Sequence, residues 1–207
     1  MTNFIQEGRS PLILASASAA RRKLLASTGL TFSTKAAHLD EAAMRTALGF
    51  KGTVDPSDVA EVLARAKAEA VSGQSGEAFV IGGDQIMSAG GNTYGKPQSF
   101  DEARARLLDL SGKSHRLHTA VVLATGGTTV WAYTDVATLT RRRFSPEFVG
   151  RYLAAAGEAV LCSVGAYQIE SLGIQLFEKR DGDLFSILGL PLLPLLDALR
   201  REGAIEG

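Results

Sequence analysis

The chain has 207 residues, of which 45% are hydrophobic and 21% charged, a composition typical of a globular protein with a substantial core. Lys and Arg number 22 and Asp and Glu 22, so no basic surplus favours a broad nucleic-acid-binding surface. The single cysteine, Cys162, excludes an intrachain disulfide framework. The first ten residues lack an apolar core, and the longest apolar stretch, 187–199, is interrupted by glycine and proline. We therefore expect a cytoplasmic protein with neither a membrane nor a nucleic-acid partner.

The first predicted strand, 11–15, leads through small residues into a helix over 19–28. Ser16 and Ser18 would bring hydroxyls and backbone N–H groups to the start of that helix, with Arg21 in its first turns. Helix N-termini attract anions, so a phosphate cradle is one interpretation. A serine N-cap beside surface arginines fits the local pattern equally well.

A second strand is expected over 30–37, followed by Asp40 and Glu41 before a short helix over 42–48. Adjacent carboxylates could help to hold a metal ion, since hard divalent cations prefer oxygen ligands. They could equally stabilise the start of the helix through their charge.

A loop over 49–57 separates these residues from a longer helix, predicted over 58–71. Lys67 would lie near the edge of its apolar face, where a lysine can point into a cleft, although most such side chains extend along the surface to solvent. The predicted apolar face consists of Val59, Val62, Leu63, Ala66 and Ala70.

The central stretch begins with Phe79-Val80-Ile81, a short buried strand expected to end at Gly82-Gly83. Asp84 would then lie just beyond the strand, where the ligands of open α/β sheets collect. A glycine-rich turn over 89–92 reverses the chain and brings Lys96 nearby, and a carboxylate and a lysine beside one hairpin would suit metal-bound phosphate. The simpler interpretation is a hairpin in which Asp84 caps a turn and Lys96 is solvated.

The second half of the chain mixes helices with hairpins. Arg141-Arg142-Arg143 is interpreted as a solvated strand end, and the loop over 162–170 carries glycine and ends in the carboxylate of Glu170. The early alternation of strands and helices, followed by hairpins, predicts an α/β fold with a mixed sheet. The remaining elements are predicted as helices over 99–110 and 145–157, strands over 118–125, 128–139 and 174–177, and a final helix that ends near 201.

Taken together, these residues resemble the Maf family of nucleoside triphosphate pyrophosphatases over nearly the whole chain. Each motif is weak alone, but their order and spacing are specific. The motifs are Leu14-Ala15-Ser16-Ala17-Ser18 with Arg21 and Leu24-Leu25, Asp40-Glu41, Lys67, Ile81-Gly82-Gly83-Asp84-Gln85, Gly95-Lys96-Pro97, Ser111-Gly112-Lys113-Ser114-His115, Gly165-Ala166-Tyr167 to Glu170, and Gly189-Leu190-Pro191.

Two positions within these motifs separate the branches of the family. Gln85 and Glu170 resemble the branch that prefers 7-methyl-GTP and also accepts UTP and CTP, whereas the branch acting on dTTP and UTP typically has Thr and Gln there. The chain departs from the family at Ala19, where Pro is usual, and at Ala20, where the branches carry Arg or Trp. It departs again at Ser163-Val164-Gly165, where Lys-Ala-Gly is frequent.

The resemblance implies an inosine-triphosphatase-like fold, an elongated mixed sheet with flanking helices and two lobes around a cleft, built as one domain over 1–207. It implies a homodimer that hydrolyses a nucleoside triphosphate such as 7-methyl-GTP, CTP or UTP to a monophosphate and pyrophosphate. Asp84 would be the general base and, with Glu41, would hold Mg²⁺ or Mn²⁺. Ser16, Arg21, Lys67 and Lys96 would neutralise the triphosphate.

The resemblance places the remaining site residues, Ser18, Ala20, Gln85 and Glu170, at the substrate. An ionised Glu170 can only accept hydrogen bonds, which favours a base edge with amino groups, as in 7-methyl-GTP or CTP, over that of dTTP. UTP fits the resemblance but presents fewer donors to a carboxylate. Two alternatives stay open: an inosine or xanthosine triphosphatase, and a nucleotide-binding regulator of cell division.

Overall fold

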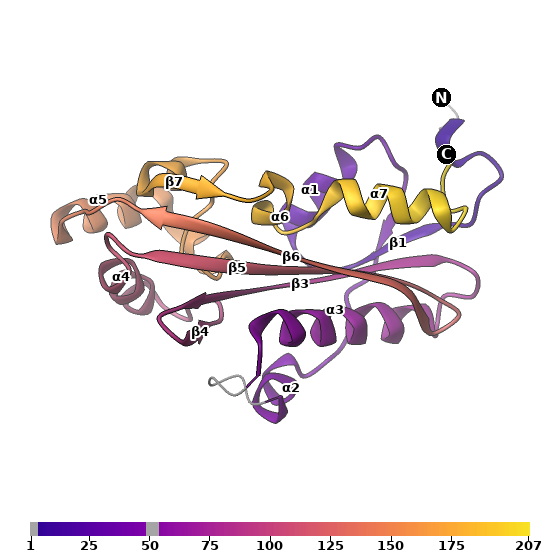
Figure 1. Cartoon of the computed structure of the whole chain (residues 1–207), viewed down its shortest axis with the longest axis horizontal. Helices are drawn as coiled ribbons and strands as arrows, with labels where there is room; N and C mark the ends of the chain where they lie inside the picture. The colour runs from indigo at the N-terminus through magenta and orange to yellow at the C-terminus, as the bar shows by residue number, and fades with distance from the viewer. Residues whose placement is uncertain (1–3, 49–53) are drawn as a thin grey trace.

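A computed structural model describes residues 4–48 and 54–207 of the chain, and its centre is a seven-stranded mixed sheet (Figure 1). The strands lie in the order β2-β1-β3-β5-β6-β7, and β4 pairs with β3 outside that path. β1 is parallel to β2 and β3, whereas β3, β5, β6 and β7 pair antiparallel with one another in turn. The strands are β1 Leu12–Ala15, β2 Ser33–Thr34, β3 Phe79–Ala89, β4 Asn92–Tyr94, β5 Ser114–Thr125, β6 Thr128–Arg141 and β7 Phe177–Asp181.

Helices cover both faces of this sheet, with α2 and α3 on one face and α1, α6 and α7 on the other (Figure 1). The α helices are α1 Ala19–Ala26, α2 Glu41–Ala47, α3 Pro56–Ser72, α4 Phe100–Asp109, α5 Pro146–Ala156, α6 Leu184–Leu188 and α7 Leu192–Arg201. Short 3₁₀ helices cover Phe4–Gln6, Gly157–Cys162 and Leu172–Leu176. Within the described ranges no helix has the length and apolar character needed to cross a membrane. The predicted α/β fold, with a mixed sheet flanked by helices, is confirmed.

β5 carries a continuous apolar run, Ala120 to Ala124, because this part of the strand is buried on both faces of the sheet. Ala120, Val122 and Ala124 pack against α3, while Val121 and Leu123 pack into the core on the face of α1 and α7. A strand buried on both faces reads as a continuous apolar run. At the other end of the strand, Leu117 belongs to a third core that α4 and α5 cover.

α3 lies directly against β3 because Gly82 has no side chain. A Cβ atom at Gly82 would lie 2.3 Å from the carbonyl oxygen of Ala64 and 2.9 Å from the Cβ of Ala68. On the opposite face of the strand, a Cβ atom at Gly83 would lie 3.1 Å from Nε of Arg21. The two glycines therefore let a helix and an arginine approach the same point of the sheet from opposite sides.

The predicted strand end at Gly82-Gly83 is wrong, because β3 continues to Ala89 and Asp84 lies inside it. β5 pairs with β3 without interruption from Val80 to Ser88, and this ladder keeps the glycines extended. The hairpin predicted over 89–92 is confirmed, with β4 as its second strand.

The other edge of β3 has partners only at its two ends. β1 pairs with Phe79 to Gly82, and β4 pairs with Met87 to Ala89. In the described part of the chain, Gly83 to Ile86 have no strand partner on this side. We call Gly83–Ile86 the open edge segment; it lies just beyond the carboxyl end of β1 and contains Asp84.

Several local predictions need correction. The strand predicted over 30–37 is reduced to the two residues of β2, because the short β1 offers them few partners. The strand predicted over 174–177 is instead a 3₁₀ helix, and pairing with β6 begins only at Phe177. Residues 49–53 of the predicted loop over 49–57 lie outside the described residues. The helices predicted over 19–28, 42–48, 58–71, 99–110 and 145–157 and the final helix are confirmed.

The apolar face predicted for α3 is also partly wrong. Val62 is 39% exposed, whereas the buried face includes Ala60, Ala64, Lys67 and Ala68. Ala64 and Ala68 lie directly over Gly82, and their small side chains allow α3 to approach the strand closely. The buried face of α3 therefore combines three alanines and Lys67 with the larger Val59, Leu63 and Val71.

Candidate active site

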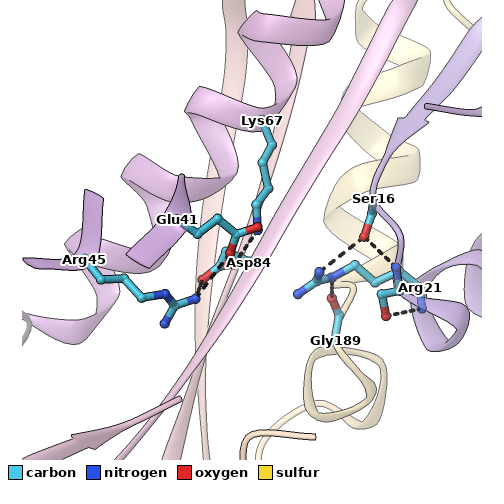
Figure 2. Close-up of polar contacts among 8 residues, drawn as sticks. Ser16, Arg21, Glu41, Arg45, Lys67, Asp84 and Gly189 are labelled. Carbon is cyan, nitrogen blue, oxygen red and sulfur yellow. Dashed lines mark hydrogen bonds and ion pairs between the residues drawn. The ribbon is translucent and has the colours of Figure 1, made fainter. Parts of the chain in front are cut away.

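Asp84 is the centre of a buried group of charged side chains (Figure 2). Its Oδ1 lies 2.7 Å from Nζ of Lys67, and its Oδ2 lies 3.2 Å from Nη2 of Arg45. Glu41 completes the group through Oε1, 2.9 Å from the same Nζ, and through Oε2, 3.7 Å from Nη2 of Arg45. Asp84 is 4% and Lys67 8% exposed, so both charges depend on these partners rather than on water.

The start of α2 decides which of the two adjacent carboxylates joins the group. Asp40 is the N-cap residue, and its side chain accepts a hydrogen bond from the N–H of Ala43 at 2.9 Å. Glu41 in the first turn is then free to reach Lys67, and Arg45, one turn later, lies on the same side of the helix. The helix-start interpretation is confirmed for Asp40, whereas Glu41 turns toward Lys67 and its role at a metal ion stays a prediction.

A second set of polar groups lies at the start of α1. Ser18 is the N-cap residue and accepts from the N–H of Arg21 at 3.3 Å, while Ser16 Oγ accepts from the N–H of Ser18 at 3.2 Å. The Arg21 side chain donates from Nη1 to Ser16 Oγ at 3.4 Å and from Nε to the carbonyl of Gly189 at 2.8 Å. The N-cap and the cradle interpretations are therefore compatible, because the serines fix both the helix and the arginine (Figure 2).

The electrostatics of the two sets are linked. Burial lowers the pKa of Arg21, while the charges of Asp84 and Glu41 act in the opposite direction. Burial would raise the pKa of Glu41, but the attraction and hydrogen bond of Lys67, with help from Arg45 and Arg21, lower it overall. Three cations therefore face two carboxylates, a balance that favours the approach of an anion.

Glu41 and Asp84 are the groups that could take part in holding a metal ion. No cluster of three or more His, Cys, Asp or Glu side chains suited to a metal occurs in the residues that the structure describes. Mg²⁺ commonly uses one or two protein carboxylates together with phosphates of a substrate. Because both carboxylates contact the same Lys67 nitrogen, they fit such a partial site, which a nucleotide would complete.

Gln85 lies on the opposite face of the sheet from Asp84, as the alternation of a strand requires. Its Nε2 lies within hydrogen-bond distance of Thr119 Oγ1, at 2.9 Å, and of the carbonyls of Ser186 and Ile187, each at 3.1 Å. The amide nitrogen thus ties β3 to α6, and the carbonyl oxygen of Gln85 accepts no hydrogen bond within the described ranges.

The other predicted site residues lie outside the Asp84 group. β4 runs antiparallel to β3 and leaves the sheet heading toward the open edge segment, and the exposed Lys96 follows two residues later. Glu170 is exposed at the end of its loop, and Ala20 is half-buried in the first turn of α1. No hydrogen bond or ion pair within the described ranges joins these three side chains to Asp84.

A pocket of about 450 Å³ lies farther along the Asp84 face of β3, bordered by Ser88, His118 and Arg116. None of the predicted site residues lines it.

Sequence reasoning missed Arg45, although its spacing of four residues from Glu41 on a predicted helix was a usable signal. It also misjudged Arg141, which is fully buried and donates from Nη2 to the carbonyl of Gly165 at 3.0 Å. Arg106, at 8% exposure, likewise bonds to distant backbone carbonyls. The sequence carried no signal for these two contacts, because the partner carbonyls lie far along the chain.

Fold and contacts together define an α/β protein whose mixed sheet holds a carboxylate–cation group beside a serine-lined helix N-terminus, an arrangement suited to a phosphorylated ligand. The chain belongs to the Maf-like protein family, whose model matches residues 11–202. This finding confirms the resemblance drawn from the motifs.

Relatives similar to this chain cover almost all of it. A protein of Brucella abortus named 7-methyl-GTP pyrophosphatase is 49% identical over 196 residues, which are 95% of this chain and 98% of the relative. A protein of Rhizobium meliloti with the same name is 50% identical over 94% and 98% of the two chains. A protein of Granulibacter bethesdensis named nucleoside triphosphate pyrophosphatase is 45% identical over 94% of this chain and 98% of the relative.

Among solved structures, the lipoprotein GNA1162 from Neisseria meningitidis aligns with 74% of this chain and 96% of its own chain. The TM-score is 0.23 and the sequence identity 13%, so this likeness supports no conclusion about the fold.

Proposed function

We propose that this protein is a nucleoside triphosphate pyrophosphatase that converts 7-methyl-GTP, or CTP or UTP, to the monophosphate and pyrophosphate. The observation that carries the proposal is the buried Asp84 carboxylate, held between Lys67 and Arg45 at the open edge segment. The names of its relatives support the same activity. A cytoplasmic location, a single domain over 1–207, two lobes around a cleft and a homodimer stay predictions.

In the proposed reaction Asp84 acts as the general base. It takes a proton from water as the water oxygen bonds to phosphorus and the link between the α and β phosphates breaks. Lys67 and Arg21, with the serine hydroxyls of Ser16 and Ser18, would stabilise the charge that develops on the phosphate oxygens. Lys96 would approach the triphosphate from the β4 side of the open edge segment.

Glu41 and Asp84 would hold a divalent cation, Mg²⁺ or Mn²⁺. The bound ion would supply neutralisation of phosphate charge. Lys67, which bridges both carboxylates in this structure, keeps them close together until the nucleotide arrives.

Glu170 is proposed to choose the base. As an exposed carboxylate it is able to accept hydrogen bonds from an amino group, such as N2 of guanine or N4 of cytosine. Gln85 would offer its carbonyl oxygen to the substrate, and the small side chain of Ala20 would leave room beside it. Where the bound base shields such a contact from water, the contact can discriminate strongly, because a mismatched base leaves the polar group unpaired.

The proposal is tested by kcat/KM for 7-methyl-GTP, CTP, UTP, dTTP, ITP and XTP with Mg²⁺, followed by anion-exchange analysis of the products of one turnover. We expect monophosphate and pyrophosphate in equal amounts, and a preference for 7-methyl-GTP or CTP over dTTP. Glu170→Gln should shift the preference toward dTTP and UTP. Stoichiometric diphosphate would overturn the reaction, and a preference for ITP or XTP would favour the inosine or xanthosine triphosphatase. An unchanged dTTP preference in Glu170→Gln would show that Glu170 does not read the base.

A further inference from the structure

Buried Arg106 of α4 joins two segments that carry residues of the proposed site. Its Nη1 donates to the carbonyl of Gly95, the residue before Lys96. The same nitrogen donates over 2.6 Å to the carbonyl of Val164, in the loop that ends at Glu170. We infer that Arg106 is a positioning residue that fixes the Lys96 segment and the Glu170 loop relative to each other. The consequence for catalysis rests on the proposed function.

The Lys96 segment is held on both sides by one ion pair of α4. Arg106 Nη2 lies 2.6 Å from Oε1 of Glu102, one turn earlier on the helix. Arg106 binds the carbonyl of Gly95, while the N–H of Gln98 donates to Oε2 of Glu102 over 2.8 Å. Lys96 lies between these two fixed points with its side chain exposed. The backbone of Lys96 is therefore held on both sides, which limits the positions that its ammonium group can reach.

The Glu170 loop is held in a comparable way by buried side chains. Three consecutive carbonyls each accept a hydrogen bond from a side chain of a different element: Val164 from Arg106 of α4, Gly165 from Arg141 of β6, and Ala166 from Tyr152 of α5. Among the residues that the structure describes, Ala166 is the one residue other than glycine with a positive φ, 58°. These contacts hold that unfavourable conformation in place.

Of the three side chains that hold the loop, Arg106 also holds the Lys96 segment. A guanidinium presents five N–H donors in a rigid plane, so one side chain can serve a carboxylate and two carbonyls together. The Arg106 guanidinium also lies 5.3 Å from the ring centre of Tyr94, at the end of β4. Lysine at this position keeps the charge but not the fork, and glutamine keeps neither.

The first test is amide hydrogen exchange of the whole protein, which does not depend on activity. Arg106→Gln and Arg106→Lys should lose exchange protection in two segments together, 95–98 and 163–170. Arg104→Gln is the matched control, since Arg104 lies on the same helix and bonds to neither segment among the described contacts. Protection unchanged in either segment would overturn the inference, whatever the enzyme hydrolyses.

The second test is a double-mutant cycle of Arg106→Gln with Lys96→Met. A displacement of about 1 Å in a positioned group can cost about 10²-fold in rate, and we expect a loss of that order in kcat/KM for Arg106→Gln. In the Lys96→Met background the same substitution should cost less, because one of the two groups that Arg106 positions is gone. Arg106→Lys should resemble Arg106→Gln, and Arg104→Gln should resemble wild type.

The outcomes separate the inference from the proposed function. Additive losses in the cycle would overturn the positioning role, and so would wild-type kinetics in Arg106→Lys, which keeps the charge but not the guanidinium geometry. A wild-type protein that releases no pyrophosphate from any nucleotide would instead refute the proposed function, and the exchange experiment would still decide whether Arg106 joins the two segments.

Discussion

Asp84 directs each of its oxygens at a different cation, Oδ1 at Lys67 and Oδ2 at Arg45. Removal of the carboxylate charge does not leave Lys67 alone in the interior, because Glu41 stays 2.9 Å from its Nζ. A buried ion pair that loses one partner normally destabilises the fold, since the remaining charge is left uncompensated. Here the second carboxylate limits that cost, so activity and stability can be separated at this position.

We expect Asp84→Asn to lower kcat by about 10²–10⁴-fold, the range for loss of a general base, while the protein stays folded. Pyrophosphate release and thermal unfolding measure the two effects. Asp109→Asn serves as the control, because Asp109 forms an exposed ion pair with Lys113 at 3.0 Å and has no place in the site. More than half of the wild-type rate in Asp84→Asn would contradict the assignment.

The site residues that the sequence predicted are those with a local pattern. Ser16, Ser18 and Arg21 follow a strand at the start of a helix, and Asp84 follows two glycines, so their types and spacing were informative. Arg141 was predicted to be solvated because charged runs usually are, and its burial depends on carbonyls of a loop that no local pattern reveals. The placement of Arg141 is therefore decided by tertiary contacts alone.

The contact between α3 and β3 explains at the level of elements why Lys67 reaches Asp84. Gly82 lets the helix approach so closely that Lys67 is buried on the face toward the strand. Any side chain at Gly82 would meet the backbone carbonyl of Ala64, which cannot swing away as a flexible side chain can.

Gly82→Ala should therefore lower the free energy of unfolding by about 1–3 kcal/mol, the usual cost of overpacking a core. Urea denaturation measures the change. Gly73→Ala at the end of the same helix is the matched control, since its φ is −59° and the nearest atom to an added Cβ is 3.5 Å away. A control of this kind is expected to be neutral or slightly stabilising. Equal urea-denaturation midpoints for Gly82→Ala and Gly73→Ala would refute the close-packing explanation.

The pairing of β3 with β5 shows why not every element boundary could be predicted. Glycines normally weaken a strand, so Gly82-Gly83 favoured a strand end. The ladder with β5, whose residues lie far along the chain, extends β3 through both glycines. Helices with clear caps, such as α3 after Asp55 and α4 after Ser99, were predicted correctly because their signals are local.

Over the whole molecule, the sheet separates two polar regions. Asp84 and its partners lie at the open edge segment, whereas His115, Tyr167 and Arg141 form a buried polar group within the core that α4 and α5 cover. His115 Nε2 lies 2.8 Å from the hydroxyl of Tyr167, and the side chain of His115 is 2% exposed. Burial, with a smaller contribution from the charge of Arg141, lowers the pKa of His115 to about 3.

This histidine predicts how the stability of the protein depends on pH. Unfolded His115 takes up a proton near pH 6.5, but the folded protein keeps it neutral down to about pH 3, so stability is lost as pH falls through that window. The slope is at most about 1.4 kcal/mol per pH unit for one proton. His118, whose pKa burial also lowers, and Glu41 add losses in the same direction, so a variant is needed to isolate His115.

We therefore expect His115→Gln, whose amide can still bond to the Tyr167 hydroxyl, to lose less stability than wild type as the pH falls from 6.5 to 4.5. The difference between their free energies of unfolding, measured by urea denaturation, should grow by up to about 1.4 kcal/mol per pH unit. His118 and every carboxylate contribute equally to both proteins, so their effects cancel in this difference. Above about pH 8 the difference should be constant, because His115 is then neutral in both the folded and the unfolded protein. Parallel stability profiles across the acid range would mean that His115 is protonated in the folded protein at the same pH as in the unfolded chain.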